Sequence, residues 1–214
     1  MLRRPQTALA HPLNVLEDIR IVQREQDALR QRRPTYHIAE PIVRFYFAVM
    51  RPYLSRLERG AGADVWRLDA RAHFSSQVLG PHFEDLARRW TATYASKTTL
   101  RGTPSIVGST VVRDASGKTS HELDVVALAS FEGRGRRRVL ALGEAKWRTD
   151  LLPDGELERL LGIKGLLEAR DDLHVAGARL LLFSPVGFTK RLRERAKEDD
   201  TVVLVDLQRM YAGD

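Results

Sequence analysis

Residues 140–147, LALGEAKW, place an apolar run of strand type directly before a charged pair. Glu144 and Lys146 are two residues apart, and residues i and i+2 of a strand share one face. A carboxylate and an ammonium group should therefore lie side by side at the end of a buried strand. Charges are costly to place there unless something binds them.

The residues before this stretch predict its partner strand. Segments 121–129 and 137–146 are both strand-like, and the linker between them contains Gly133 and Gly135. These glycines supply the backbone freedom that a tight turn needs. We therefore expect a hairpin whose turn is centred on Arg134.

Residues equally distant from position 134 then face each other, which pairs Asp124 with Glu144 and Glu122 with Lys146. Opposite Cβ atoms of antiparallel strands are about 4.5–5.5 Å apart. Two carboxylates so placed repel each other unless a divalent cation binds between them or one is protonated. Hard oxygen ligands suit Mg²⁺ or Mn²⁺, and Lys146 could orient a water or stabilise developing negative charge. The alternative is an ordinary set of solvated ion pairs at the rim of the sheet.

The elements around this hairpin predict an α/β fold. Helical periodicity covers 77–95, where Glu84 falls at the edge of the apolar face and Asp85 points to solvent. Strands and helices then alternate, which indicates a mixed central sheet flanked by helices. The further expected elements are strands at 106–113, 177–185 and 201–207, and helices at 153–170 and 187–197.

The first 59 residues predict a partial winged helix. Residues 12–17 resemble the end of a helix, and 19–25 and 36–38 resemble strands separated by a basic loop. A further helix begins near Pro41 and ends near Gly60. We expect two domains, 1–59 and 60–214.

Composition narrows the class of partner. The 214 residues include 35 Lys and Arg against 28 Asp and Glu, a net charge of +7, which favours polyanions and nucleic acid first. The absence of cysteine excludes disulfides and thiolate metal sites, and it fits a reducing cytoplasm. We find neither an apolar run long enough for a membrane span nor the pattern of a signal peptide.

A phosphate-loop motif is not supported. ASGKTS contains Gly117, Lys118 and Thr119, but the position that the motif requires as a second glycine is Val112. A strand-like segment follows where the motif requires a helix. We therefore interpret Asp114–Gly117 as a hairpin turn.

The acids and their order resemble the PD-(D/E)xK nuclease superfamily. The resemblance lies in Glu84 on an early helix, Leu123-Asp124 in place of the usual Pro-Asp, and Glu144-Ala145-Lys146 at the next strand end. More narrowly, four blocks in order resemble the C-terminal region of archaeal and bacterial AAA-type ATPases of the DUF234 group. These blocks are YHIAEPIVRFYFAVMRPY, LGPHFEDLARRW, HELDVVAL and LALGEAKW, and the resemblance spans roughly residues 13–210.

The resemblance implies a restriction-endonuclease-like fold and a set of site residues. Asp124 and Glu144 would be metal ligands for Mg²⁺ or Mn²⁺, Lys146 would assist the attacking water, and Glu84 would contact the metal or a metal-bound water. Glu122 would be an outer partner. In that group a winged helix and an ATPase module precede the nuclease-like domain. The ATPase module has no counterpart in these residues, which implies an AAA-type ATPase partner or a longer chain.

Two arginine-rich loops are candidate nucleic-acid contacts. Phosphates attract exposed arginine, and a loop at a hairpin tip or at the wing of a winged helix is well placed to reach them. The residues are Arg32, Arg33, Arg134, Arg136, Arg137 and Arg138.

We therefore expect a metal-dependent nuclease that acts on DNA more readily than on RNA, with a homodimer as one way to cut both strands. An inactive module of the same fold that binds nucleic acid or an ATPase is the alternative. A transcription regulator built on the partial winged helix is a third, less favoured, hypothesis, because sequence for a recognition helix is missing.

Overall fold

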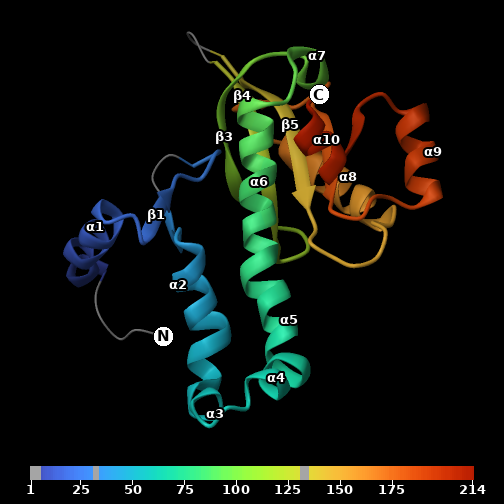
Figure 1. The fold of residues 1–214 in the computed structure, drawn as a ribbon. Helices are drawn as coiled ribbons and strands as arrows, with labels where there is room; N and C mark the ends of the chain where they lie inside the picture. Colours follow the sequence, from blue (N-terminus) through green and yellow to red (C-terminus); the bar gives the residue numbers. More distant parts are fainter. Residues whose placement is uncertain (1–5, 31–33, 131–134) are drawn as a thin grey trace. The chain divides into compact units, whose positions relative to one another are not determined.

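The computed structural model describes residues 6–30, 34–130 and 135–214 (Figure 1). The chain forms two compact units, one of residues 1–26 and 32–81 and one of residues 27–31 and 82–214. Apart from the short segment 27–31, the first unit therefore ends at residue 81 and the second begins at residue 82. The domain boundary expected near residue 60 stays a prediction.

The first unit opens with a helix followed by a two-stranded sheet. Helix α1 (Ala10–Asp18) precedes strands β1 (Val22–Glu25) and β2 (Thr35–Ile38), which pair antiparallel. This is the expected order of helix, strand, loop and strand. Arg32 and Arg33 of the connecting loop lie outside the described residues, and the winged-helix assignment stays a prediction.

The rest of this unit is helical. A left-handed backbone at Gly60 (φ +80°) follows the first helical segment, as the sequence predicts. The second segment begins at residue 62, well before the helix expected from residue 77, and buries Val65, Ala70 and Val78 against Val49. None of the described helices is long and apolar enough to cross a membrane. The helical elements are α2 (Pro41–Phe45), η2 (Tyr46–Met50), η3 (Arg51–Tyr53), α3 (Leu54–Glu58), α4 (Gly62–Val65), η4 (Trp66–Ala70), α5 (Arg71–Phe74) and η5 (Ser75–Leu79), preceded in the chain by η1 (Gln6–Leu9).

The second unit is built on a mixed sheet, which confirms the expected α/β class. The strand order is β3-β4-β5-β7-β8, and β6 pairs with β5 off this path. Strands β3, β4 and β5 are antiparallel, whereas β5, β7 and β8 are parallel. The strands are β3 (Pro104–Asp114), β4 (Thr119–Ala129), β5 (Arg137–Ala145), β6 (Leu173–His174), β7 (Arg179–Ser184) and β8 (Val202–Asp206).

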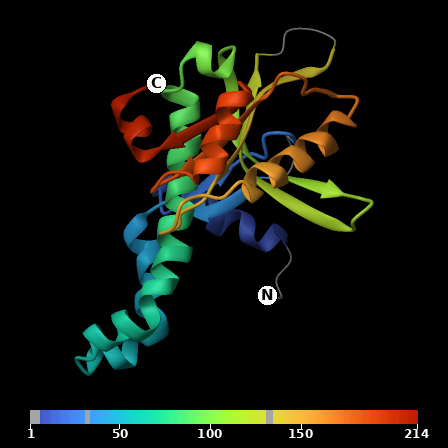
Figure 2. The same ribbon diagram turned by 90° about the vertical axis from the view of Figure 1, so that its right-hand side faces the viewer.

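Helices cover both faces of this sheet (Figure 2). Side chains of α6 (Gly80–Thr93) pack on one face with α10 (Leu207–Ala212), and side chains of α8 (Gly155–Glu168) and α9 (Lys190–Glu198) pack on the other. Helices α8 and α9 connect the parallel strands, since a parallel pair needs a long crossover. The short helix α7 (Lys97–Leu100) links α6 to β3.

The hairpin register near the acids agrees with the sequence. Val125 pairs with Gly143 and Ala127 with Ala141, so the same register one step further aligns Asp124 with Glu144. Beyond Ala127 the register shifts by one residue, so the expected symmetry about residue 134 is wrong there. A bulge at Leu140 explains the shift, because two successive residues then share one face. The β3–β4 turn lies between Asp114 and Thr119, as expected.

Candidate active site

Asp124 and Glu144 lie on adjacent strands and on the sheet face that packs against α8. Val126 on β4 and Leu142 on β5 belong to the apolar cluster of α8, and residues two apart share a face. Both acids are buried, with only 5% and 1% of their surface exposed. The sheet therefore carries two adjacent carboxylates into its interior.

Two hydrogen bonds hold Asp124, one accepted by its side chain and one by its backbone carbonyl. The backbone N–H of Ala145 donates to Oδ2 of Asp124 at 2.8 Å. From α6, Arg88 donates to the carbonyl oxygen of Asp124 at 3.0 Å and also pairs with Asp85. Burial, followed by the charge of Glu144, raises the pKa of Asp124 to about 7, although the Ala145 hydrogen bond acts in the opposite direction. This carboxyl is thus poised to hold a proton or to bind a cation.

Glu144 is neutralised by two cations. Lys146 pairs with its Oε1, and Arg159 of α8 lies 2.5 Å from its Oε2. The second contact is an ion pair without the alignment of a hydrogen bond. Arg159 also donates to the carbonyl oxygen of Glu122 at 2.9 Å. Together the two side chains bring two positive charges to one buried carboxylate.

Lys146 follows the last residue of β5 and is attached to the next strand through its backbone. Its N–H donates to the carbonyl oxygen of Phe183 at 3.1 Å. Burial acts to lower the pKa of Lys146, but the hydrogen bond and charge of Glu144 outweigh it, with a smaller contribution from Asp124, and the pKa is raised. The side chain is therefore a cation at neutral pH, not a general base.

Glu84 lies in the first turns of α6, beside the strand ends. Phe83 packs edge-on against Trp147, with ring centroids 5.6 Å apart, which holds this part of α6 against the residues that follow β5. Burial raises the pKa of Glu84, and Arg88 acts to lower it. Glu84 is close enough to Asp124 for its charge to raise the pKa of that carboxyl as well.

The assignment of Glu84, Asp124 and Glu144 as one set of metal ligands stays a prediction. Within residues 6–30, 34–130 and 135–214, no group of three or more acidic or histidine side chains is arranged to hold a metal ion. The structure instead brings Asp124, Glu144 and Lys146 together, with Glu84 near them. Mg²⁺ in proteins is commonly held by one or two carboxylates together with waters and substrate phosphates. Two adjacent buried carboxylates fit that chemistry without a third.

The arginines of the β4–β5 hairpin contact the protein itself. Arg136 pairs with Asp171 at 3.6 Å, and Arg137 pairs with Asp172 at 3.2 Å. Arg138 donates to the carbonyl oxygen of Arg101 at 3.1 Å. Arg136 and Arg138 nevertheless remain exposed. Arg134, at the expected turn, lies outside the described residues.

The contacts of Arg88 and Arg159 with the acids were not predicted from the sequence. Both reach the acids from helices distant in the chain, and helical periodicity does not report such contacts. Arg159 lies between Leu157 and Leu160, two apolar positions of α8 that are buried. This place beside the apolar face was the one sequence feature that could have indicated a contact with the sheet. Lys164, further along α8, lies 3.9 Å from Glu168 in an intrahelical pair.

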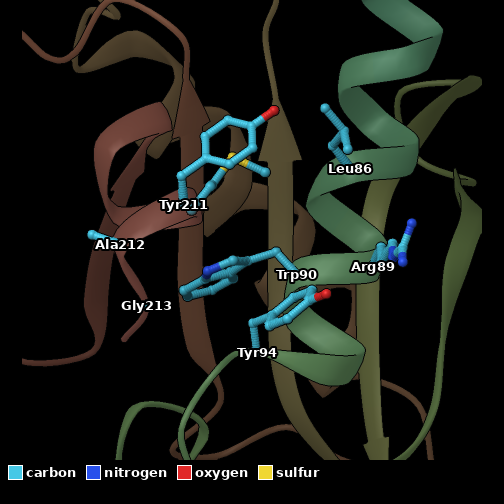
Figure 3. Close-up of a pocket in the computed structure, with 8 residues that line it drawn as sticks. Leu86, Arg89, Trp90, Tyr94, Tyr211, Ala212 and Gly213 are labelled. Carbon is cyan, nitrogen blue, oxygen red and sulfur yellow. The ribbon is translucent and has the colours of Figure 1, made fainter.

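A pocket of about 410 Å³ lies elsewhere in the second unit, between α6 and the chain end (Figure 3). Trp90, Tyr94, Tyr211 and Arg89 line it. The candidate site residues Glu84, Asp124, Glu144 and Lys146 are not among its lining residues. The tyrosines are 54% and 79% exposed. The chemistry of the buried acids, and not the size of this pocket, therefore defines the candidate active site.

Comparison with known proteins adds no identification. The chain matches no protein-family model. Searches of the curated proteins and of the solved structures give no match either. Functional inference therefore depends on the residues and contacts described above.

Proposed function

We propose that the second unit is a divalent-metal-dependent nuclease domain of the PD-(D/E)xK type that hydrolyses phosphodiesters in DNA. The observation that carries this proposal is the burial of Asp124 beside Glu144, with Lys146 paired to the latter. Adjacent buried carboxylates destabilise a fold, and such strained ionisable groups are concentrated at functional sites. A structural ion pair would need neither the second acid nor its raised pKa.

Asp124 and Glu144 would hold Mg²⁺ or Mn²⁺, and Glu84 would act on a water bound to the ion. Their hard oxygens match these metals. When bound, such an ion polarises a phosphoryl oxygen and makes a water more acidic. The backbone N–H of Ala145 orients Asp124, because it fixes Oδ2.

Lys146 would act as a fixed positive charge. Its raised pKa keeps it protonated, so it stabilises the negative charge that develops on the phosphoryl oxygens. In the hydrolysis, a water oxygen forms a bond to phosphorus, the phosphorus–oxygen bond to the leaving nucleotide breaks, and the water proton passes to solvent. The leaving oxygen gains a proton.

The partners follow from charge and from the family resemblance. The net charge of +7 favours nucleic acid, and Arg136 and Arg138 are exposed for phosphate contact. Arg32, Arg33 and Arg134 stay candidate contacts on sequence grounds. We further propose a cytoplasmic protein that acts with an AAA-type ATPase of the DUF234 type, and a homodimer where both strands are cut.

A second candidate function is nucleic-acid binding without cleavage. The exposed Tyr94 and Tyr211 beside Arg89 favour it, because aromatic rings stack on single-stranded bases and arginine attracts the backbone. In this case Tyr94→Ala and Tyr211→Ala would weaken binding of single-stranded DNA, and Asp124→Asn would leave binding unchanged. Fluorescence anisotropy on a labelled oligonucleotide distinguishes the two functions.

The nuclease proposal is tested by cleavage of labelled single- and double-stranded DNA in Mn²⁺. Wild type should cut, whereas Asp124→Asn, Glu144→Gln and Lys146→Met should lose at least about 100-fold in rate. Glu158→Gln is the matched control, since it also removes a negative charge but lies in an exposed pair with Arg195 of α9. Equal rates in wild type and in the three site variants would overturn the proposal.

A further inference from the structure

The guanidinium of Arg159 is the least expected part of the candidate site. It reaches from α8 to one oxygen of Glu144, while Lys146 occupies the other. Because Glu144 is almost fully buried, its charge would be very costly without these partners. The two cations therefore supply the same total charge as one divalent ion.

We propose that Arg159 is a positioning residue that holds Glu144 in the metal-free protein and leaves it when a divalent cation binds. This inference rests on the proposed metal site at Asp124 and Glu144. A carboxylate oxygen paired at 2.5 Å with a guanidinium is not available as a metal ligand. Metal affinity is thus set partly by the free energy needed to break this ion pair.

The Arg159 side chain lies partly at the surface, so it can leave Glu144 for solvent. One third of its side chain is exposed, so the released guanidinium can reach solvent without being buried alone. Its second contact is with the carbonyl oxygen of Glu122, an exposed residue of β4. A planar guanidinium binds phosphate with two parallel hydrogen bonds. Arg159 in its released position would therefore be suited to contact the substrate backbone.

The first test measures Mn²⁺ affinity by calorimetry for wild type, Arg159→Gln and Lys164→Gln. Lys164→Gln is the matched control, because it removes the same charge from the same helix, and Lys164 pairs with Glu168 and not with Glu144. Arg159→Gln should bind Mn²⁺ about 10-fold tighter, which corresponds to the loss of one competing ion pair. Lys164→Gln should stay within about twofold of wild type.

A second measurement separates displacement from a general effect of charge. The guanidinium Nη–H signal of Arg159, assigned by its loss in Arg159→Gln, should be sharp and protected in metal-free protein, because both Nη atoms contact acceptors. Saturation with Mg²⁺ should shift and broaden it, because the guanidinium gains solvent and motion. The corresponding signal of Arg88, which stays on the Asp124 carbonyl oxygen, should not broaden.

The outcomes distinguish this inference from the proposed function. If wild type binds Mn²⁺ but Arg159→Gln binds it equally or more weakly, or if the Arg159 signal is unchanged by Mg²⁺, the displacement is overturned and the nuclease proposal survives. If Arg159→Gln binds Mn²⁺ and wild type does not, the displacement is supported. If neither protein binds Mn²⁺, both proposals fail.

Discussion

The backbone N–H of Ala145 donates a 2.8 Å hydrogen bond to Oδ2 of Asp124, across the strands that carry the two buried acids. This bond fixes Asp124 next to Glu144, although the two negative charges repel each other. The backbone thereby maintains a pair that the side chains alone would not. The stability of the protein should consequently report on the site before any activity is measured.

Asp124→Asn should stabilise the protein at high pH. The folded-state pKa of Asp124 is raised to about 7 from 3.8, so the folded protein holds one more proton than the unfolded chain between these values. Stability is then lost as pH rises from about 4 to about 7. The advantage of Asp124→Asn over wild type should accordingly grow between about pH 4 and about pH 7, as measured by chemical denaturation.

Asp114→Asn provides a control of opposite sign. Hydrogen bonds from the Ser116 side chain and the Gly117 backbone lower the pKa of Asp114. Its contribution is present above the unfolded-state pKa and is lost as pH falls. Wild type should thus exceed Asp114→Asn in stability at neutral pH, with a difference that closes in acid. The same trend with pH in both variants would contradict the assigned environments.

Removing Arg159 should cost more stability than removing the charge of Glu144. Glu144 is 1% exposed, whereas its partners Lys146 and Arg159 are 38% and 33% exposed. In Glu144→Gln the two cations can turn to water, but in Arg159→Gln the buried anion keeps only one partner. We expect Arg159→Gln to be the less stable variant by roughly 1–2 kcal/mol, allowing for solvent screening. Denaturation in the absence of metal checks this order, and the reverse order would argue against the buried ion pair.

Gly143 should tolerate no side chain. A Cβ added there would lie 3.1 Å from the Cβ atoms of Leu181 and Val125. Gly143→Ala should therefore cost about 1–3 kcal/mol and displace Glu144, the next residue. Gly162→Ala on α8 is the control, because a Cβ there meets nothing within 4 Å, and it should gain about 0.5–1 kcal/mol. Thermal unfolding distinguishes the two, and equal stability would contradict the tight contact between β5 and β7.

The alignment of Asp124 with Glu144 could be predicted because it depends on local information. The hydrophobic pattern sets the faces of two consecutive strands, and with them the residues that can lie side by side. The bulge at Leu140 could not be predicted, since a bulge adds a residue without a distinct composition. It lies between the acids and the linker, so the expected pairing of Asp124 with Glu144 holds because the bulge shifts the register by one residue.

The role of Arg159 was not accessible from the sequence for a different reason. The loop between β5 and α8 separates Arg159 from its partner Glu144. The contact between them depends on how α8 packs on β5. The helical segment from residue 62 was missed because apolar residues lie on more than one side of it, and Trp66 and Leu68 remain exposed. The pattern of residues therefore left undetermined the contacts between elements and, at residues 62–79, the extent of a helical segment.

The most direct test is calorimetric titration of Mn²⁺ into wild type, Asp124→Ala and Glu144→Ala, each first freed of metal with a chelator. If the two buried acids form a metal site, wild type takes up Mn²⁺ and both variants lose this binding while remaining folded by circular dichroism. Uptake that is the same in all three proteins, or absent from wild type and Arg159→Gln alike, would contradict a metal site at Asp124 and Glu144.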